Sequence, residues 1–334
     1  MNIVWFILGL FFVLFVAIFG LWIFGERGHL MLPSTRHALG LDRKRKKGQT
    51  PRSVPTHTHP HPHPHTTPHP KPGLLDPLHA YVYARWTNQY ISFLLNWLMP
   101  RMSEKQRVQW ANSYHGKVLT PELAVELVKL DHDIDARDVE QIVPYPVARD
   151  IVLKNPIGIT LYECACRHAR ENPCQPTNVC MAIGTDKDNF VVEHNPNSAR
   201  RITQEEAIRI LREEHERGHV HSAWFKDVVG GRMFAICNCC KCCCGGIEGM
   251  MKYGAHTMAS SGYVATIDEN NCTTCGVCVD VCPFDAISME RTGTTVNATT
   301  CMGCGVCASQ CAFEGIALLR DPRKPEPLDV RVLA

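Results

Sequence analysis

The chain lacks an excess of charge of one sign. Its 35 basic and 33 acidic residues give a net charge of +2, so nothing in the overall charge favours a nucleic-acid partner. It also lacks a Walker motif, a nucleophile elbow and an H-E-x-x-H motif, and its glycine pairs at 230–231 and 245–246 lack the strand and helix context of a dinucleotide fold. The sequence therefore contains no motif that indicates a nucleotide-binding protein or a common hydrolase.

What the sequence has in excess is cysteine, with 18 residues, eight of which follow the spacing C-x2-C-x2-C-x3-C twice near the C-terminus. This spacing is a signature of [4Fe–4S] sites, in which the fourth cysteine of each run ligates the other cluster. We therefore predict two [4Fe–4S] clusters, the first held by Cys272, Cys275, Cys278 and Cys311 and the second by Cys301, Cys304, Cys307 and Cys282. Structural zinc sites are the alternative, although these usually use two separated C-x2-C pairs.

The repeat extends beyond the cysteines, because residues 266–272 align with 295–301 and residues 281–287 align with 310–316. We expect a short β-rich segment before and after each cysteine loop. Over about residues 262–320 the chain resembles the bacterial-type dicluster ferredoxin domain, and the resemblance implies a small ferredoxin-like fold that transfers single electrons. Ala312 departs from this family, which usually has proline there, and we expect the change to alter local hydrogen bonding without removing a ligand.

Ten further cysteines lie in the middle of the chain: Cys164, Cys166, Cys174, Cys180, Cys237, Cys239, Cys240, Cys242, Cys243 and Cys244. We interpret them as ligands of one or more additional iron–sulfur clusters, since the first four are enough for one cubane and the later run could supply another or share ligands. Structural zinc sites and redox-active thiols that form reversible disulfides remain open alternatives. Arg167, His168 and Lys241 could stabilise a thiolate or a reduced cluster, or be ordinary surface or loop residues.

The N-terminus is almost unbroken apolar sequence from Ile3 to Phe24, which is long enough for a transmembrane helix. A cleaved signal peptide is the alternative, but the chain has no basic n-region and no A-x-A site. Basic residues follow the apolar run, including those at 43–47, so the positive-inside rule places the C-terminal body in the cytoplasm. The cysteine content also favours a reducing compartment. We therefore expect a single-pass protein of the cell membrane.

The expected fold class is α+β, with an N-terminal transmembrane helix, a mixed α/β cysteine-rich middle domain and a small C-terminal ferredoxin-like dicluster domain. We expect a transmembrane anchor (1–25), a basic and His/Pro-rich linker (26–73), an amphipathic aromatic helix (74–100), a cysteine-rich α/β domain (101–258), a dicluster ferredoxin domain (259–322) and a tail (323–334). The histidine tract at 56–70 is interpreted as a semi-rigid spacer, with metal binding as the alternative. The aromatic stripe formed by Val82, Trp86, Tyr90, Phe93 and Trp97 could pack in a core, on a membrane surface or on a partner.

Local signals predict several further elements. Helices are predicted over 78–99, from Ser103 to about 116, from the cap at Thr120, over 147–155, and from the capping box at Thr203 to near 218. Strands are predicted over 157–163 and 232–236. The pair His219 and His221 resembles a metal site, but packing in a strand is the better interpretation.

These features favour a membrane-anchored iron–sulfur protein that relays single electrons between redox partner proteins, with no nucleic-acid partner. One alternative is a redox enzyme whose middle-domain cysteines form a catalytic iron–sulfur or dithiol site that the ferredoxin domain feeds. A second alternative is a membrane-anchored redox or metal sensor that uses the histidine tract.

Overall fold

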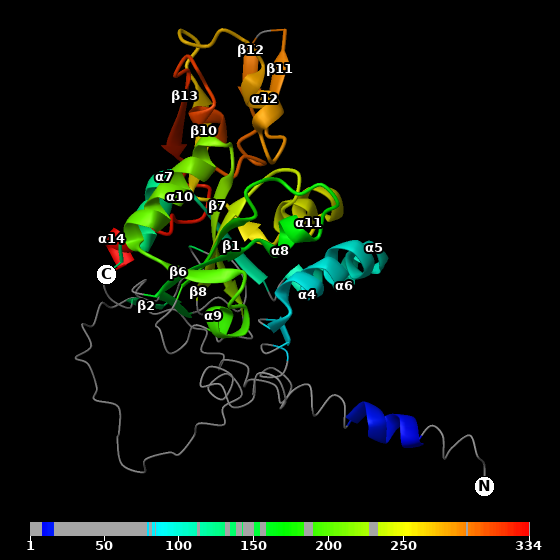
Figure 1. The fold of residues 1–334 in the computed structure, drawn as a ribbon. Coiled ribbons are helices and arrows are strands. Elements are labelled where there is room, and N and C mark those ends of the chain that lie inside the picture. The colour runs from blue at the N-terminus through cyan, green and yellow to red at the C-terminus, as the bar shows by residue number, and fades with distance from the viewer. Residues whose placement is uncertain are drawn as a thin grey trace, which may run out of the picture. The chain divides into compact units, whose positions relative to one another are not determined.

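The computed structural model describes residues 9–16, 79, 82–83, 85–111, 114–130, 134–137, 142, 150–153, 158–183, 190–226, 233–291 and 293–333. The chain divides into two compact units, Met1–Leu78 and His79–Ala334. All 18 cysteines lie in the second unit, which holds every element labelled in Figure 1. The residues from 79 onwards therefore form one compact unit.

Within the part of the chain that the structure describes, the transmembrane helix predicted over 1–25 is not found, which corrects the expected fold class. Among the described residues, no helix is long and apolar enough to cross a membrane. The helical stretch described there covers residues 9–16, and the rest of the predicted anchor lies outside the described residues. The fold is a mixed α/β structure with a large sheet and a cysteine-rich region. The predicted linker and histidine tract lie outside the described residues.

A seven-stranded sheet forms the centre of the second unit. The strands stand in the order β6 (Ala199–Ile202), β4 (Ile159–Glu163), β5 (Asn178–Ile183), β8 (Met233–Cys239), β7 (Val220–Lys226), β1 (Tyr114–Leu119) and β9 (Met258–Ala259). The pairs are antiparallel except for β1 and β9, which run parallel. The strand predicted over 157–163 is confirmed as β4, and the one over 232–236 is the first part of the longer β8.

One face of the sheet is covered by α7 (Pro121–Val128) and α10 (Gln204–Glu216), which lie side by side in Figure 1. Their apolar faces share a core with Leu161, Met181 and Phe225 of the sheet. Both helices begin as predicted, because the Thr120 hydroxyl accepts a hydrogen bond from the Leu123 N–H and the Thr203 hydroxyl accepts one from the Glu206 N–H. Local capping chemistry therefore places both helices correctly.

The opposite face is covered by α4 (Thr87–Phe93), the π-helical segment η2 (Leu94–Leu98), α5 (Met99–Arg101), α6 (Glu104–Ala111) and α11 (Gly245–Tyr253). Three short helices also accompany the sheet: α8 (Ala165–His168), α9 (Phe190–His194) and α14 (Val330–Leu333). The predicted helix over 78–99 is thus present as α4 and η2 within the described residues. The predicted helix from Ser103 ends early, because the chain enters β1 at Tyr114.

The helix predicted over 147–155 is wrong. The described part of this segment is the strand β3 (Asp150–Leu153), which pairs antiparallel with β2 (Ile134–Arg137). Ile151 and Val152 are β-branched and favour an extended backbone once a partner strand is available. The structure of this segment is decided by its pairing with β2. The local sequence pattern does not reveal that partner strand.

The ferredoxin-like region consists of two related halves. β10 (Tyr263–Ile267) precedes the first cysteine loop, and α12 (Val277–Val281) and β11 (Ile287–Glu290) follow; β12 (Gly293–Val296), α13 (Val306–Ser309) and β13 (Ile316–Arg320) repeat this order. β10 pairs with β13 and β11 pairs with β12, so the halves are interlocked. The two strand pairs lie at one end of the second unit (Figure 1). The predicted β-segments before and after each loop are confirmed.

The C-terminal tail returns to the sheet and closes over a buried lysine. Leu328 and Val330 join the core beside α7. The Lys117 ammonium is fully buried and donates hydrogen bonds to the Ile142 and Glu326 carbonyl oxygens at 2.7 and 2.6 Å. Burial, with the nearby charge of Arg320, lowers the pKa of Lys117 to about 7. This lysine therefore ties β1 to the tail.

The lowered pKa predicts a dependence of stability on pH. Between about pH 7 and pH 10 the unfolded chain binds a proton at Lys117 that the folded chain has released, so the free energy of unfolding rises with pH across this window. We expect the anaerobic urea midpoint to rise more between pH 7 and pH 9.5 in the wild type than in Lys117→Met. Lys129→Met, which removes an exposed lysine, is the matched control. Parallel midpoint curves for the wild type and Lys117→Met would contradict the prediction.

Candidate metal centres

Four of the repeat cysteines line one cavity in the ferredoxin-like region: Cys272, Cys275, Cys278 and Cys311. The cavity encloses about 360 Å³ of space, part of it open to solvent. Cys275 is exposed and the other three are partly buried. These four residues are the first predicted ligand set, and we call them the outer cysteine set.

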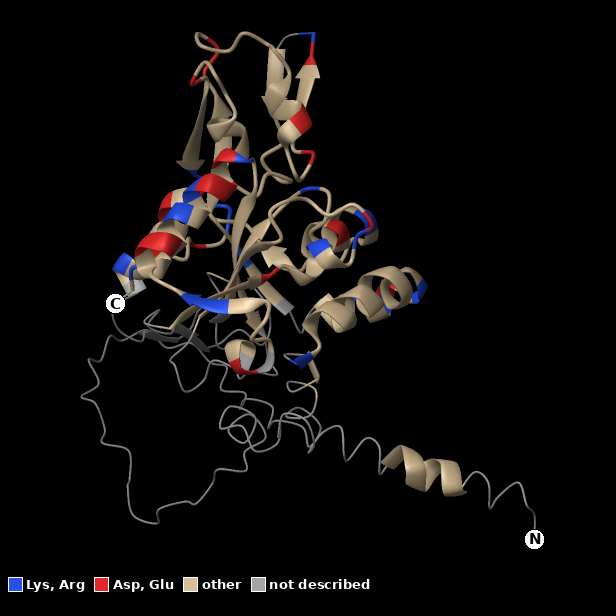
Figure 2. Ribbon diagram, viewed as in Figure 1, with Lys and Arg blue, Asp and Glu red and all other residues tan. Residues whose placement is uncertain are grey.

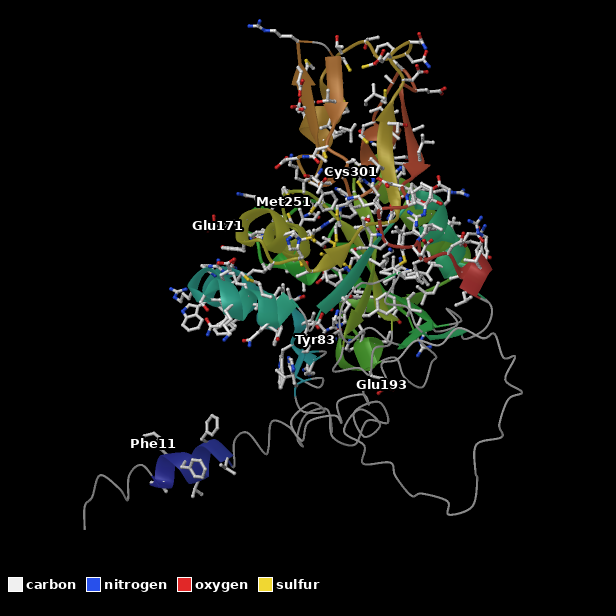
Figure 3. All side chains as sticks on the ribbon, turned by 180° about the vertical axis from the view of Figure 1, so that it is seen from behind. Phe11, Tyr83, Glu171, Glu193, Met251 and Cys301 are labelled. Atoms are coloured by element: carbon white, nitrogen blue, oxygen red, sulfur yellow. The ribbon has the colours of Figure 1, made fainter. Side chains whose placement is uncertain are left out.

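The other four repeat cysteines line a second cavity, of about 310 Å³: Cys282, Cys301, Cys304 and Cys307. All four are buried, and Cys301 lies where the ferredoxin-like region meets the rest of the unit (Figure 3). Burial, with the charges of Cys301 and Cys282, raises the pKa of Cys307 to about 12. Thiols crowded in this way lose their protons most readily to a bound metal. These four residues are the second predicted set, and we call them the inner cysteine set.

The two sets are held by one backbone conformation that occurs twice. Left-handed residues occupy equivalent places in the two halves: Thr274, Gly276 and Asp285 in the first, and Gly303, Gly305 and Glu314 in the second. The Ala286 N–H donates to the Cys282 sulfur at 3.3 Å, and the equivalent Gly315 N–H donates to the Cys311 sulfur at 3.4 Å. The hydrogen bond is thus present beside Ala312 too, so the expected change in local hydrogen bonding does not affect this contact.

Six of the ten middle-domain cysteines form a ring around a larger cavity, which we call the thiol chamber: Cys164, Cys166, Cys180, Cys237, Cys239 and Cys244; Cys240 also lines this cavity. Electrostatic interactions between neighbouring thiols close this ring in the order 164, 180, 237, 239, 244 and 166. The chamber encloses about 830 Å³, part of it open to solvent, which is more than twice either cavity of the ferredoxin-like region.

Several elements of the fold direct these cysteines into the chamber. Because side chains alternate along a strand, Cys237 and Cys239 of β8 share one face, while Asn238 between them contacts the His221 ring at 2.6 Å. Cys180 comes from the neighbouring strand β5, and Cys244 is the residue before α11. The pair His219 and His221 therefore packs at the sheet, as the sequence indicates, and does not form part of the chamber.

Aromatic and aliphatic side chains complete the chamber wall, among them Tyr83, Trp110, Tyr162 and Trp224. The sequence interpretation missed these residues, because nothing in their spacing links them to the cysteines. Of the predicted aromatic stripe, Phe93 and Trp97 stack on each other with ring centres 5.0 Å apart and remain half exposed. Leu94 and Leu95 between them are buried and contribute to the chamber wall instead.

One thiol of the chamber, that of Cys239, has a lowered pKa. A hydrogen bond with Cys237, followed by one with Cys244, lowers the pKa of Cys239 to about 6 despite its burial. The Ser222 hydroxyl lies 3.5 Å from the Cys239 sulfur and accepts a hydrogen bond from the Trp224 indole N–H. These contacts favour the thiolate form of Cys239, and a metal centre in the chamber would supply the positive charge that a buried anion requires.

The three charged residues beside the cysteines are all paired. The Arg167 guanidinium is fully buried and donates to Glu214 at 3.0 Å and to the Asn238 carbonyl oxygen at 3.2 Å. His168 pairs with Glu163 at 2.9 Å, and Lys241 pairs with Asp285 at 2.9 Å. Burial alone would raise the pKa of Glu214, but its contacts with His219 and Arg167 lower it overall. Arg167 is therefore part of a buried ion pair, whereas His168 and Lys241 form surface pairs.

The remaining four middle-domain cysteines form a separate group: Cys174, Cys240, Cys242 and Cys243. Their sulfurs all lie within 4.8 Å of one another, and we call them the surface quartet because Cys242 is exposed. Each group mixes early and late cysteines. The structure therefore does not bring Cys174 together with Cys164, Cys166 and Cys180 as one set, contrary to the simplest interpretation of the sequence.

Charged side chains are sparse around these centres. Figure 2 shows many acidic and basic residues on α10, with others on α6, α11 and β6, while most of the sheet is without charge. The inner cysteine set shares one continuous apolar core with Cys239 and Cys244 of the thiol chamber. The inner set and the chamber therefore share one core, and Cys278 of the outer set packs against it.

Comparison with known proteins identifies part of this arrangement. Residues 265–288 match the family model of the 4Fe-4S binding domain. The match includes the first cysteine run, from Cys272 to Cys282, and does not reach the second. No curated protein matches the chain. The chain therefore contains an iron–sulfur binding domain of the ferredoxin type.

Proposed function

We propose that this protein is an electron-transfer protein with two [4Fe–4S] clusters, one on the outer and one on the inner cysteine set, and a further iron–sulfur cluster in the thiol chamber. The residues fit such clusters, because each ferredoxin-like cavity is lined by four thiols, and the two cavities have nearly the same size. A [4Fe–4S] cluster bound by four thiolates takes up and releases one electron at a time. The observation that carries the proposal is the continuous core that joins the inner set to the chamber.

The surrounding residues indicate which end of the proposed relay meets a partner protein. Cys275 of the outer set is exposed, so this end of the molecule is accessible to a redox partner protein. The four cysteines of the inner set are buried, and apolar residues such as Phe284 and Val306 exclude water around them. Burial and hydrogen bonds to sulfur both tune the potential of an iron–sulfur site. The high cysteine content supports a reducing compartment, such as the cytoplasm, as the place of action.

The chamber supports a second candidate function, that of a redox enzyme. A cubane uses four thiolates, whereas the chamber presents six cysteines around a cavity of about 830 Å³. Two thiols, or an open iron, would then remain beside this cavity. A chamber variant that retains its iron but loses turnover would favour this function. The sensor alternative depends on the histidine tract, which lies outside the described residues.

Metal analysis tests the proposal directly. We expect the anaerobically purified full chain to contain about eight iron and eight sulfide for the two ferredoxin-like clusters, and about four more of each for a cubane in the chamber. Cys278→Ser, Cys307→Ser and Cys180→Ser should each remove one centre, in the outer set, the inner set and the chamber respectively. EPR spectra of the reduced proteins would show which signal each variant loses. A full chain with zinc and no iron would refute the proposal.

A further inference from the structure

The surface quartet is formed by two loops that are distant in the sequence. Cys174 lies between α8 and β5, whereas Cys240, Cys242 and Cys243 belong to the turn between β8 and α11. The sulfurs of Cys174 and Cys242 are 2.7 Å apart, and those of Cys242 and Cys243 are 3.5 Å apart. Cys240 also borders the thiol chamber, so the quartet lies directly behind one wall of that cavity.

The close spacing of the sulfurs distinguishes the quartet from the other cysteine groups. Four thiolates on one tetrahedral zinc ion, with bonds of about 2.3 Å, lie about 3.8 Å from one another. In a cubane each cysteine binds a different iron, so the sulfurs are much farther apart. Within the described residues, the quartet is the one cysteine group in which three or more sulfurs all lie within 4.8 Å of one another. The two ferredoxin-like sets and the chamber ring are wider.

The loops around the quartet are already fixed by hydrogen bonds. The Cys174 backbone N–H donates to the Cys243 sulfur at 3.4 Å, a contact that commonly stabilises metal-bound thiolates. The Arg170 guanidinium donates to the Cys243 carbonyl oxygen at 3.2 and 3.0 Å and also pairs with Glu248. The Cys244 N–H closes the turn onto the Cys240 carbonyl oxygen at 3.2 Å. Both loops are thus held in place for a common ligand.

We propose that Cys174, Cys240, Cys242 and Cys243 bind a single tetrahedral metal ion of the zinc class, separate from every iron–sulfur cluster. The ion has no open coordination position, so its role is structural. It joins the loop before β5 to the turn before α11, and thereby holds Cys239 and Cys244 at the chamber wall. The quartet uses none of the six ring sulfurs, although Cys240 also lines the chamber, so metal counts in variants of each group distinguish the two sites.

Metal counts in matched variants test this site. In the anaerobically purified full chain we expect about one zinc per chain beside the iron. Cys242→Ser and Cys174→Ser should each lose the zinc and retain iron, sulfide and the EPR signals of the wild type. Lys241→Ala, which changes an exposed residue in the same turn, should retain all metals. Cys180→Ser should show the reverse pattern, with zinc retained and chamber iron lost.

A measurement on the wild type keeps the test valid if a quartet variant does not fold. X-ray absorption at the zinc edge should show four sulfur neighbours at about 2.3 Å. The proposal is overturned if Cys242→Ser loses about four iron and four sulfide, because the quartet would then hold a cubane. It is also overturned if the quartet variants change no metal content, or lose a single iron in place of zinc. Failure of the proposed electron-transfer function would appear in the iron count instead.

Discussion

Gly303→Ala is expected to abolish iron binding by the inner cysteine set and to lower stability by about 3 kcal/mol or more. Gly303 has a φ of +62°, and a Cβ added there would lie 2.2 Å from the Tyr263 carbonyl oxygen and 2.4 Å from the Ser261 hydroxyl oxygen. The Tyr263 oxygen belongs to the paired strand β10 and cannot move without breaking the strand pair. The loop that carries Cys301 and Cys304 must therefore shift.

The chain offers a matched control for this variant. Gly254 has almost the same φ, +63°, but no atom lies within 4 Å of an added Cβ. Gly254→Ala should therefore cost only the left-handed backbone strain of about 1–2 kcal/mol and retain the full iron content. Thr274, at the equivalent place in the first half, has a φ of +53° and carries a side chain, which shows that this conformation alone is tolerable. Similar thermal midpoints and iron contents for Gly303→Ala and Gly254→Ala would refute the steric explanation.

Arg167→Met is expected to destabilise the protein by about 3 kcal/mol, which is the second large effect. Arg167 and Glu214 are both fully buried, 3.0 Å apart. Removal of one partner of a buried ion pair typically costs about 3–5 kcal/mol, because a charge is left in a site without water. We expect the lower end of this range, because Arg217 and His219 still contact Glu214 at 2.6 and 2.7 Å. Anaerobic urea unfolding of the holoprotein would measure the difference.

Arg200→Ala is the control for this prediction. Arg200 pairs with Glu206 at 2.6 Å, but its side chain is 55% exposed. An exposed ion pair contributes about 0–1 kcal/mol, because water screens the charges. Replacement of both Arg167 and Glu214 by apolar residues should recover part of the lost stability. If Arg167→Met and Arg200→Ala unfold at the same urea concentration, the buried pair does not have the role described here.

Helices whose start is set by a hydrogen bond between nearby residues could be predicted well from the sequence. The helices after Thr120 and Thr203 begin where their caps indicate, because the capping hydrogen bond involves residues only three positions apart. Errors arose where the partner is distant. The segment at 150–153 is a strand because it pairs with residues 134–137. The strand β1 was missed because its partners, β7 and β9, are likewise distant in the chain. The apolar length of the N-terminus indicated a transmembrane helix, and no described helix is long enough to be one.

The sequence by itself determined the two groups of repeat cysteines. The spacing within each run indicates which three thiols share a loop, and in this signature the fourth cysteine of each run joins the three of the other run. The structure gathers the same eight residues into the same two groups. Only the tertiary structure decided how the other ten cysteines divide. Alternation along β8 sends Cys237 and Cys239 into the chamber, whereas the following turn directs Cys242 and Cys243 towards Cys174. Neighbouring cysteines point in different directions, so their grouping depends on the strands and loops that the fold brings beside them.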